Sequence, residues 1–252
     1  WAECISTDAA KSKQFYADVM GWDSDEMPMG DSGAMYTMFK HDGHYVAGLG
    51  PAQVGSPMPS HWMSYVAVDD VDAIAPKVTE LGGKILFGPM DVFESGRMIS
   101  IQDPTGAVLG LWQAKNHIGA GLVNQPGAML WNELLTRDVE AAKTFYNKLL
   151  GWEYVSDETG YLMIKNNGRY NGGMMQMDDS YGEMPPVWNV YFNVPDIEAA
   201  FEKVKAIGGT VVQDQINSAG DAGRFAIVVE PTGATAMLME SHNVDAWDVE
   251  MA

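Results

Sequence analysis

Residues 1–8 read Trp-Ala-Glu-Cys-Ile-Ser-Thr-Asp, and residues 131–138 read Trp-Asn-Glu-Leu-Leu-Thr-Arg-Asp. The likeness extends outward, because 8 of 22 positions are identical between residues 1–22 and 131–152. Three further blocks recur in the same order, and all four blocks together match at 29 of 71 positions. Unrelated sequences of average composition would match at about 4 of these positions. The chain is therefore an internal duplication, which has to be recognised before any element is assigned.

A stretch rich in Gly, Asn and Pro separates the two copies at residues 114–127. This composition is typical of a linker. We predict a first domain over residues 1–115, a linker over 116–127, a second domain over 128–243 and an acidic tail over 244–252. Each domain has about 115 residues, a length that can bury a core of its own.

Within each half, the hydrophobic spacing alternates between the strand period and the helix period. Phe15 with Val19, and Tyr16 with Met20, are i, i+4 pairs that predict a helix after a short strand. Asp8 and Asp138 are suitable N-caps, Gly21 and Gly151 are suitable C-terminal residues, and a second helix is expected over residues 70–81. Each half then reads as two β-α-β-β-β modules. The predicted fold is α+β, with a curved, mostly antiparallel sheet in each domain and the helices on its outer face.

The charge balance excludes several classes of partner. The chain has 34 acidic and 15 basic residues, a net charge of −19, so its surface repels nucleic acids and anionic lipid headgroups. No apolar run approaches the ~18 residues of a membrane span. A single cysteine, Cys4, cannot form an internal disulfide or a multi-cysteine zinc site. We expect no nucleic-acid partner, no membrane association and a cytoplasmic location; Trp1 in place of an initiator Met suggests that further residues precede it.

The repeated signposts resemble those of the vicinal-oxygen-chelate superfamily, which includes glyoxalase I, extradiol dioxygenases and bleomycin resistance proteins. The resemblance covers nearly the whole chain. It is carried by Asp8, Phe15-Tyr16, Gly21-Trp22, Val68 to Asp72, Leu81 to Gly83 and Asp103 to Gly106, and by their counterparts in the second half. The Trp-x-Glu-Leu opening at Trp131 and the run Gly110 to Ala114 resemble tandem-domain glyoxalase-like proteins of actinobacteria that are often labelled hydroxylases. This architecture implies that a monomer can make the module contacts that single-domain members make by dimerising.

The resemblance also implies a divalent cation held by His, Gln or Glu from the first and last strands of two modules. Those positions fall on Trp1, Gly48, Met63 and Gly110 in the first half and on Trp131, Gly173, Asn189 and Met237 in the second. Of these, Asn189 alone offers a hard oxygen ligand. We therefore expect no cofactor at the usual site and keep one alternative, an irregular divalent-metal site formed by His44 and Glu3.

Strand alternation points Glu3 and Glu133 to the same concave face as Trp1 and Trp131. We predict that the two carboxylates act in acid/base catalysis, because an apolar setting adjusts a carboxyl group for proton transfer. The predicted substrate-binding residues are Trp1, Tyr65, Trp112, Trp131, Asn189 and Tyr191. Together they describe an aromatic- and Met-lined cavity for a small molecule. The structural alternative is that each Glu bonds the backbone or a tyrosine hydroxyl.

Three functions fit these features. The first is a lyase, isomerase or hydroxylase-like activity on a small oxygenated molecule, without the usual metal. The second is a non-catalytic protein that binds or sequesters a small molecule, as the antibiotic-resistance members do. The third is a structural partner protein with a filled cavity. Arg97 and Arg224, which recur beside a glycine, either bind an anionic group or pair with acidic residues, and the excess of acidic residues favours pairing.

Overall fold

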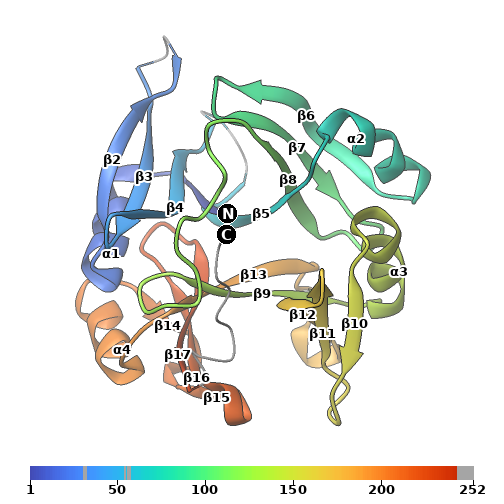
Figure 1. Cartoon of the computed structure of the whole chain (residues 1–252). Helices are drawn as coiled ribbons and strands as arrows, with labels where there is room; N and C mark the ends of the chain where they lie inside the picture. The colour runs from blue at the N-terminus through green and yellow to red at the C-terminus, as the bar shows by residue number, and fades with distance from the viewer. Residues whose placement is uncertain (31–32, 54, 56–57, 243–252) are drawn as a thin grey trace. The chain divides into compact units, whose positions relative to one another are not determined.

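The computed structural model describes residues 1–30, 33–53, 55 and 58–242 (Figure 1). The predicted acidic tail, 244–252, lies outside the described residues. The predicted β-α-β-β-β order occurs in three modules, and a fourth module follows it with one additional short strand; we number these modules 1 to 4 along the chain. The α+β fold class is confirmed. No helix among the described residues has the length and apolar character needed to cross a membrane.

The first half contains modules 1 and 2. Module 1 consists of β1 (Ala2–Ser6), α1 (Ala9–Met20), β2 (Asp23–Pro28), β3 (Met35–His41) and β4 (His44–Pro51). Module 2 consists of β5 (His61–Ala67), α2 (Val71–Glu80), β6 (Lys84–Val92), β7 (Gly96–Gln102) and β8 (Val108–Ala114).

The second half repeats this order in modules 3 and 4. Module 3 consists of β9 (Met129–Thr136), α3 (Val139–Leu150), β10 (Glu153–Ser156), β11 (Leu162–Asn166) and β12 (Arg169–Gln176). Module 4 consists of β13 (Val187–Asn193), α4 (Ile197–Ala206), β14 (Thr210–Val211), β15 (Asn217–Ser218), β16 (Gly223–Val229) and β17 (Thr235–Ser241). Two short strands with intervening single turns therefore take the place that the long strand β6 has in module 2.

The helix boundaries follow the capping signals in the sequence. The Asp8 side chain accepts a hydrogen bond from the Lys11 N–H, and Gly21 ends α1 in the left-handed conformation with φ of 69°. Asp138 and Gly151 do the same for α3. A left-handed residue at this position favours glycine, because a side chain there is strained. The predicted caps are confirmed.

The strands form two sheets, one of eight strands in the first half and one of nine in the second, and in each module the first strand pairs in parallel with the last. The register places Glu3 opposite Gly48 in module 1 and Glu133 opposite Gly173 in module 3. The corresponding pairs are Tyr65 with Gly110 in module 2 and Tyr191 with Met237 in module 4.

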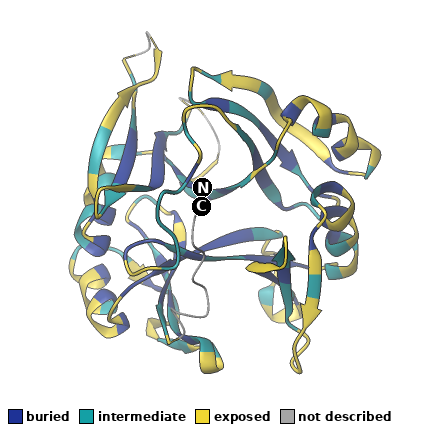
Figure 2. Ribbon diagram, viewed as in Figure 1, coloured by how far each residue is buried: buried dark blue, intermediate teal, exposed yellow. Residues whose placement is uncertain are grey.

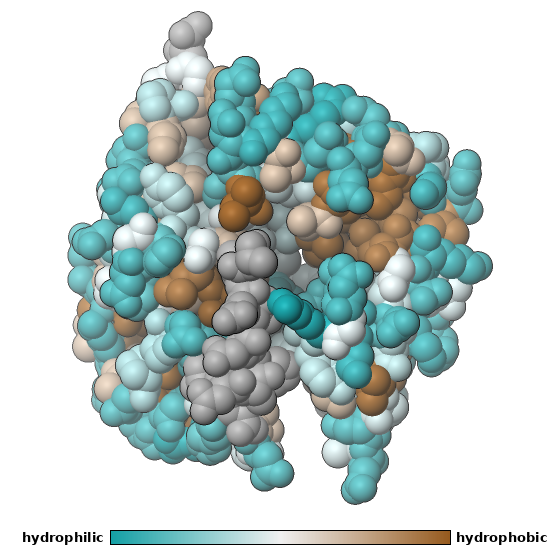
Figure 3. All heavy atoms as spheres, viewed as in Figure 1, coloured by the Kyte–Doolittle hydropathy of each residue, from teal (hydrophilic) through white to brown (hydrophobic). Residues whose placement is uncertain are grey.

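The modules pack into two compact units that interleave the halves. Unit 1 contains residues 1–62, 120–130 and those from 190 onward, and unit 2 contains residues 63–119 and 131–189. In unit 1, α1 packs with α4, and in unit 2, α2 packs with α3. Each helix buries one stripe and exposes the other (Figure 2). Hydrophilic residues cover most of the face shown in Figure 3. The predicted domains, 1–115 and 128–243, follow the sequence repeat and stay a prediction, whereas each compact unit joins modules from different halves.

Two buried carboxylates tie the interleaved modules within their units. Asp103 follows β7 and accepts hydrogen bonds from the Thr105 and Gly106 N–H groups at 2.8 and 2.9 Å and from the Tyr146 hydroxyl of α3 at 3.0 Å. Glu230 follows β16 and accepts from the Ser12 hydroxyl of α1 at 3.2 Å. Both residues are at most 3% exposed. We call Asp103 and Glu230 the turn carboxylates. Each accepts hydrogen bonds from the backbone of the turn that follows it and from a helix of the other half of the chain.

Two tyrosines of unit 2 with buried hydroxyl groups give a matched stability test. The Tyr154 hydroxyl is buried and has no hydrogen-bond partner among the described residues, whereas the Tyr146 hydroxyl bonds Asp103 and accepts from the Trp188 N–H at 2.9 Å. Leaving a buried polar group unpaired costs about 1–3 kcal/mol. Tyr154→Phe should therefore be neutral or stabilising, and Tyr146→Phe should lower the free energy of unfolding by about 1–3 kcal/mol. Urea denaturation compares the two; equal destabilisation would contradict the contrast.

Candidate functional site

In module 1, a chain of hydrogen bonds joins the predicted site residues through a tyrosine that the sequence did not single out. The Trp1 indole N–H donates to the Tyr36 hydroxyl at 3.3 Å. Tyr36 in turn is hydrogen-bonded to the Glu3 carboxylate. Trp1 and Glu3 alternate along β1 with the fully buried Ala2 and Cys4. They therefore lie on the sheet face opposite the one that packs on the unit 1 core.

Module 3 repeats the arrangement. The Trp131 indole N–H donates to the Tyr161 hydroxyl at 2.9 Å, and Tyr161 is hydrogen-bonded to Glu133. Glu133 is 9% exposed. We call each set a Trp–Tyr–Glu relay, defined as Trp1–Tyr36–Glu3 and Trp131–Tyr161–Glu133. The same three residue types interact in two modules. The arrangement is therefore a feature of the repeated sequence.

Burial is the main influence on both tyrosines. It raises the pKa of Tyr36 and of Tyr161 well above the usual tyrosine range, and the neighbouring Glu3 or Glu133 carboxylate raises each pKa further. Both hydroxyls are therefore protonated at neutral pH and available as donors.

Glycine is required opposite each Glu because the tyrosine hydroxyl occupies the adjoining space. A Cβ atom on Gly48 would lie 1.9 Å from the Tyr36 hydroxyl oxygen and 3.1 Å from Trp1 Nε1. A Cβ atom on Gly173 would lie 2.0 Å from the Tyr161 hydroxyl oxygen. A side chain at either position would clash with the tyrosine of the relay. Each relay therefore requires a glycine opposite its glutamate.

Modules 2 and 4 place aromatic rings at the equivalent strands. In module 2, the Tyr65 ring covers Gly110, whose added Cβ would lie 2.3 Å from Tyr65 Cδ1. The Tyr65 and Trp112 rings meet edge to face with centroids 6.5 Å apart, and the Trp112 N–H donates to the His117 carbonyl at 2.8 Å. In module 4, Tyr191 packs against Phe225 at 5.7 Å.

Asn189 stands apart from the other predicted residues. Its side chain is 9% exposed, and its Nδ2 donor has no hydrogen-bond partner among the described residues. An unpaired buried donor is costly and often marks a place where water or a ligand binds. Asn189 belongs to unit 2, as does the module 3 relay.

In modules 1 and 3, the positions that the resemblance assigns to metal ligands do not fit a divalent cation. In module 1 they are Trp1, an indole that can only donate, and Gly48, where the Tyr36 hydroxyl fills the space of a side chain. Module 3 has the same pair in Trp131 and Gly173. His44 does not join Glu3 either, because it lies at the exposed start of β4, four residues before the register partner of Glu3, or about 13 Å along the strand.

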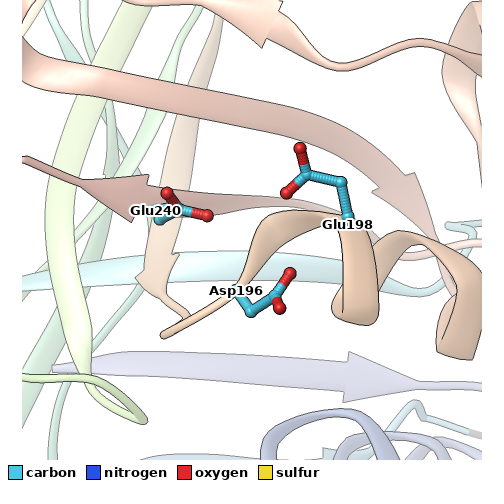
Figure 4. Close-up of side chains that lie close together, drawn as sticks. All are labelled: Asp196, Glu198 and Glu240. Atoms are coloured by element: carbon cyan, nitrogen blue, oxygen red, sulfur yellow. The ribbon is translucent and has the colours of Figure 1, made fainter.

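Among the described residues, the one group of three potential metal ligands is Asp196, Glu198 and Glu240 (Figure 4). All three are committed elsewhere: Asp196 caps α4, and the Arg224 guanidinium binds both Glu198 and Glu240. The hydrogen bond from the Ile197 N–H, and after it the one from Arg224, hold the pKa of Glu240 below its usual range. Arg97 pairs with Asp72 at 2.8 Å in the equivalent place. The expected pairing of Arg97 and Arg224 with acidic residues is confirmed.

The sequence repeat contains a signal that identifies the two tyrosines that the sequence analysis did not single out. Tyr36 and Tyr161 are identical at equivalent positions of the repeat, and so are Gly48 and Gly173. Tyr36 is the second residue of β3, and Tyr161 directly precedes β11, so the alternation of side chains along β1 or β9 does not identify either tyrosine.

Comparison with known proteins agrees with this architecture. The family model of the glyoxalase/bleomycin resistance protein/dioxygenase superfamily matches residues 1–111 and 125–238. The chain is 39% identical over 240 residues to the "Putative glyoxylase CFP32" of Mycobacterium tuberculosis, covering 93% of this chain and 91% of that protein. It is 31% identical over 258 residues to the anthracycline biosynthesis protein DnrV of Streptomyces peucetius, covering 95% and 92%.

A solved structure with the same fold is the Mn(II)-bound glyoxalase of Novosphingobium aromaticivorans, with a TM-score of 0.64 at 17% identity, covering 95% of this chain and 80% of that one. The chain belongs to the glyoxalase/bleomycin resistance protein/dioxygenase superfamily, and its two matched regions correspond to the two halves of the repeat.

Proposed function

We propose that this protein binds a small oxygenated organic molecule at the relay-bearing sheet faces, with Glu3 and Glu133 as acid/base groups and without the divalent cation usual in the family. The observation that carries the proposal is the close approach of each tyrosine hydroxyl to Gly48 or Gly173. This contact fills the space of a metal ligand and directs the tyrosine at a carboxylate instead.

The remaining predicted residues give the proposed site its apolar walls and one polar group. Trp1 and Trp131 present indole rings beside the carboxylates, and Tyr65, Trp112 and Tyr191 present rings from the strands of their own modules. The unpaired Asn189 amide would donate to a ligand oxygen. Aromatic walls with a few polar groups suit a planar, oxygenated molecule.

The chemistry open to such a site is proton transfer. A carboxylate takes a proton from a carbon next to a carbonyl, the electron pair stays on the ligand as an enolate, and return of the proton to another atom completes an isomerisation. Relatives named for anthracycline biosynthesis support an aromatic, polyoxygenated ligand. The non-catalytic alternative shares the site and the ligand class but performs no proton transfer.

A fluorescent anthracycline tests the proposal, because its emission reports binding and its absorbance reports conversion. We expect saturable quenching in wild type with two molecules bound per chain, one for each relay. Glu3→Gln should abolish conversion at one site, and the double variant with Glu133→Gln should abolish all conversion, while both sites still bind the anthracycline, about tenfold more weakly. Binding without conversion in wild type would favour the non-catalytic alternative. Binding unaffected by the double variant would overturn the proposed site.

A further inference from the structure

Unit 1 contains a cavity of about 300 Å³ that none of the relay residues lines. Its walls come from the end of α1, the end of β3, the linker residues 126–127 and the first turns of α4 with the residues that lead into it. The two helices contact each other and lie side by side in Figure 1. All of the lining residues belong to unit 1. The volume lies at the lower end of the range for small-molecule sites.

The interior of the cavity is apolar. Four of its lining side chains are at most 9% exposed, namely Val19, Met20, Val194 and Ala200. The same four residues belong to the hydrophobic core of unit 1. The cavity is therefore continuous with that core, and it suits the hydrocarbon part of a ligand, whose burial removes apolar surface from water.

The backbone groups of the cavity wall at Gly127 are already paired. The Gly127 N–H donates to the Asn193 carbonyl at 2.8 Å, and the Gly127 carbonyl accepts from the Trp22 indole N–H at 2.7 Å. The Asn193 N–H donates to the Ala128 carbonyl at 2.8 Å. The His41 ring covers Gly127, since an added Cβ atom there would lie 2.4 Å from His41 Nε2. Polar recognition of a ligand is therefore left to side chains.

Lys203 supplies a cation to this wall. It is exposed, and its ammonium group has no carboxylate partner among the described residues. The wall also holds the His41 imidazole, 3.8 Å from Asp42, and the carboxylate of Asp196. Asp196 accepts a hydrogen bond from the Ala199 N–H at 2.9 Å as the N-cap of α4. It precedes Lys203 by seven residues, or about 10 Å along the helix, so an anion at Lys203 lies two turns from this carboxylate.

We propose that this cavity is a second binding site, for a small amphipathic monocarboxylate whose hydrocarbon part fills the apolar interior and whose carboxylate pairs with Lys203. Apolar burial supplies most of the affinity, and the exposed ion pair supplies selectivity. The net charge of −19 repels anions from the surface as a whole, so saturable binding of a carboxylate requires a local cation. This site is independent of the relays and of the ligand proposed for them.

Three probes of one chain length separate apolar burial from charge. Hexanoate carries a negative charge at pH 7, hexanamide is neutral and hexylamine is positively charged. We expect wild-type protein to bind hexanoate with a Kd of about 1 mM and hexanamide about threefold more weakly, with hexylamine weaker than either. Two-dimensional NMR of nitrogen-15-labelled protein measures binding, with the amides of Gly127 and Ala199 as reporters at the cavity.

Two variants test the apolar interior and the cation separately. Ala199→Leu fills the cavity from an exposed position of α4, so it should abolish saturable binding of hexanoate and hexanamide while the protein stays folded. Lys203→Gln should weaken hexanoate binding about threefold and leave hexanamide binding unchanged. Lys205→Gln is the matched control, because Lys205 lies on the same helix, pairs with Asp214 at 2.9 Å and does not line the cavity. It should leave both affinities unchanged.

The proposal has clear contrary outcomes. Unchanged hexanoate binding in Ala199→Leu, or an absence of saturable hexanoate binding by wild type, would overturn the site. Equal effects of Lys203→Gln and Lys205→Gln would overturn the role of Lys203. The Glu3→Gln/Glu133→Gln variant should bind hexanoate as wild type does. Loss of hexanoate binding in that variant would mean that the carboxylate binds at the relays, which would overturn this inference and leave the proposed function standing.

Discussion

Gly48→Ala is expected to break the module 1 relay and to lower the free energy of unfolding by about 1–3 kcal/mol, the usual cost of overpacking a filled site. The new methyl group would lie 1.9 Å from the Tyr36 hydroxyl oxygen and 2.7 Å from Tyr36 Cζ, so the ring has to move away from Glu3. Ligand binding at module 1 should be lost with it. Chemical denaturation and the anthracycline titration measure the two effects.

A double-mutant cycle identifies the cause. Tyr36→Phe removes the oxygen that the methyl group meets first, so Gly48→Ala should cost less stability in the Tyr36→Phe background than in wild type. The equivalent cycle with Gly173 and Tyr161 should show the same sign, because the corresponding distance there is 2.0 Å. If Gly48→Ala is as stable as wild type and still binds ligand, the tyrosine hydroxyl does not occupy the place that the structure gives it.

The second large effect is expected at a turn carboxylate. Asp103→Ala removes the acceptor of the Tyr146 hydroxyl and of the Thr105 and Gly106 N–H groups, at a site that is 3% exposed. Unpaired buried donors of this kind should cost about 3 kcal/mol in total, which for a chain of this size lowers Tm by roughly 6–12 °C. Differential scanning calorimetry measures the change.

Asp91→Ala is the control for the loss of an aspartate in the same unit. Asp91 lies on the surface, where it pairs with Lys115 at 3.2 Å, and exposed pairs contribute about 1 kcal/mol or less. Similar Tm values for the two variants would mean that Asp103 does not tie α3 to its turn.

The fold could be predicted from the sequence because the same caps and strands recur in both halves of the duplication. Helix caps are local signals, so Asp8, Asp138, Gly21 and Gly151 were found from spacing alone and are confirmed. Alternation along β1 also placed Trp1 and Glu3 on one face, because it needs only the residues of that strand.

The relay itself was beyond local reasoning. The link between Tyr36 and Glu3 depends on how β3 is registered against β4 and β4 against β1, and such register is set by contacts distant in sequence. The sequence reading allowed for a tyrosine hydroxyl bonding each Glu but named no partner. The interleaving of the halves was missed for the same reason, since it depends on which helices pack together.

The ion pairs of Arg97 and Arg224, in contrast, could be predicted from the sequence. An excess of acidic residues made an ion pair the favoured interpretation, and repeat-equivalent acids, Asp72 and Glu198, supply it. Composition was sufficient here because the pairing needs only a carboxylate within reach of a strand end. The irregular site of His44 with Glu3 failed because composition gives no information about distance along a strand.

We propose that the two relays occupy the place where this family holds its metal, and a measurement of bound metal tests this directly. Tag-free protein purified without chelator would be incubated with Ni, Zn, Fe(II) or Mn, desalted and analysed by inductively coupled plasma mass spectrometry beside the Glu3→Gln/Glu133→Gln variant. We predict well below one ion per chain for each metal and no difference between the two proteins. A near-stoichiometric ion that is lost in the variant would contradict the account and return the two glutamates to a ligand role.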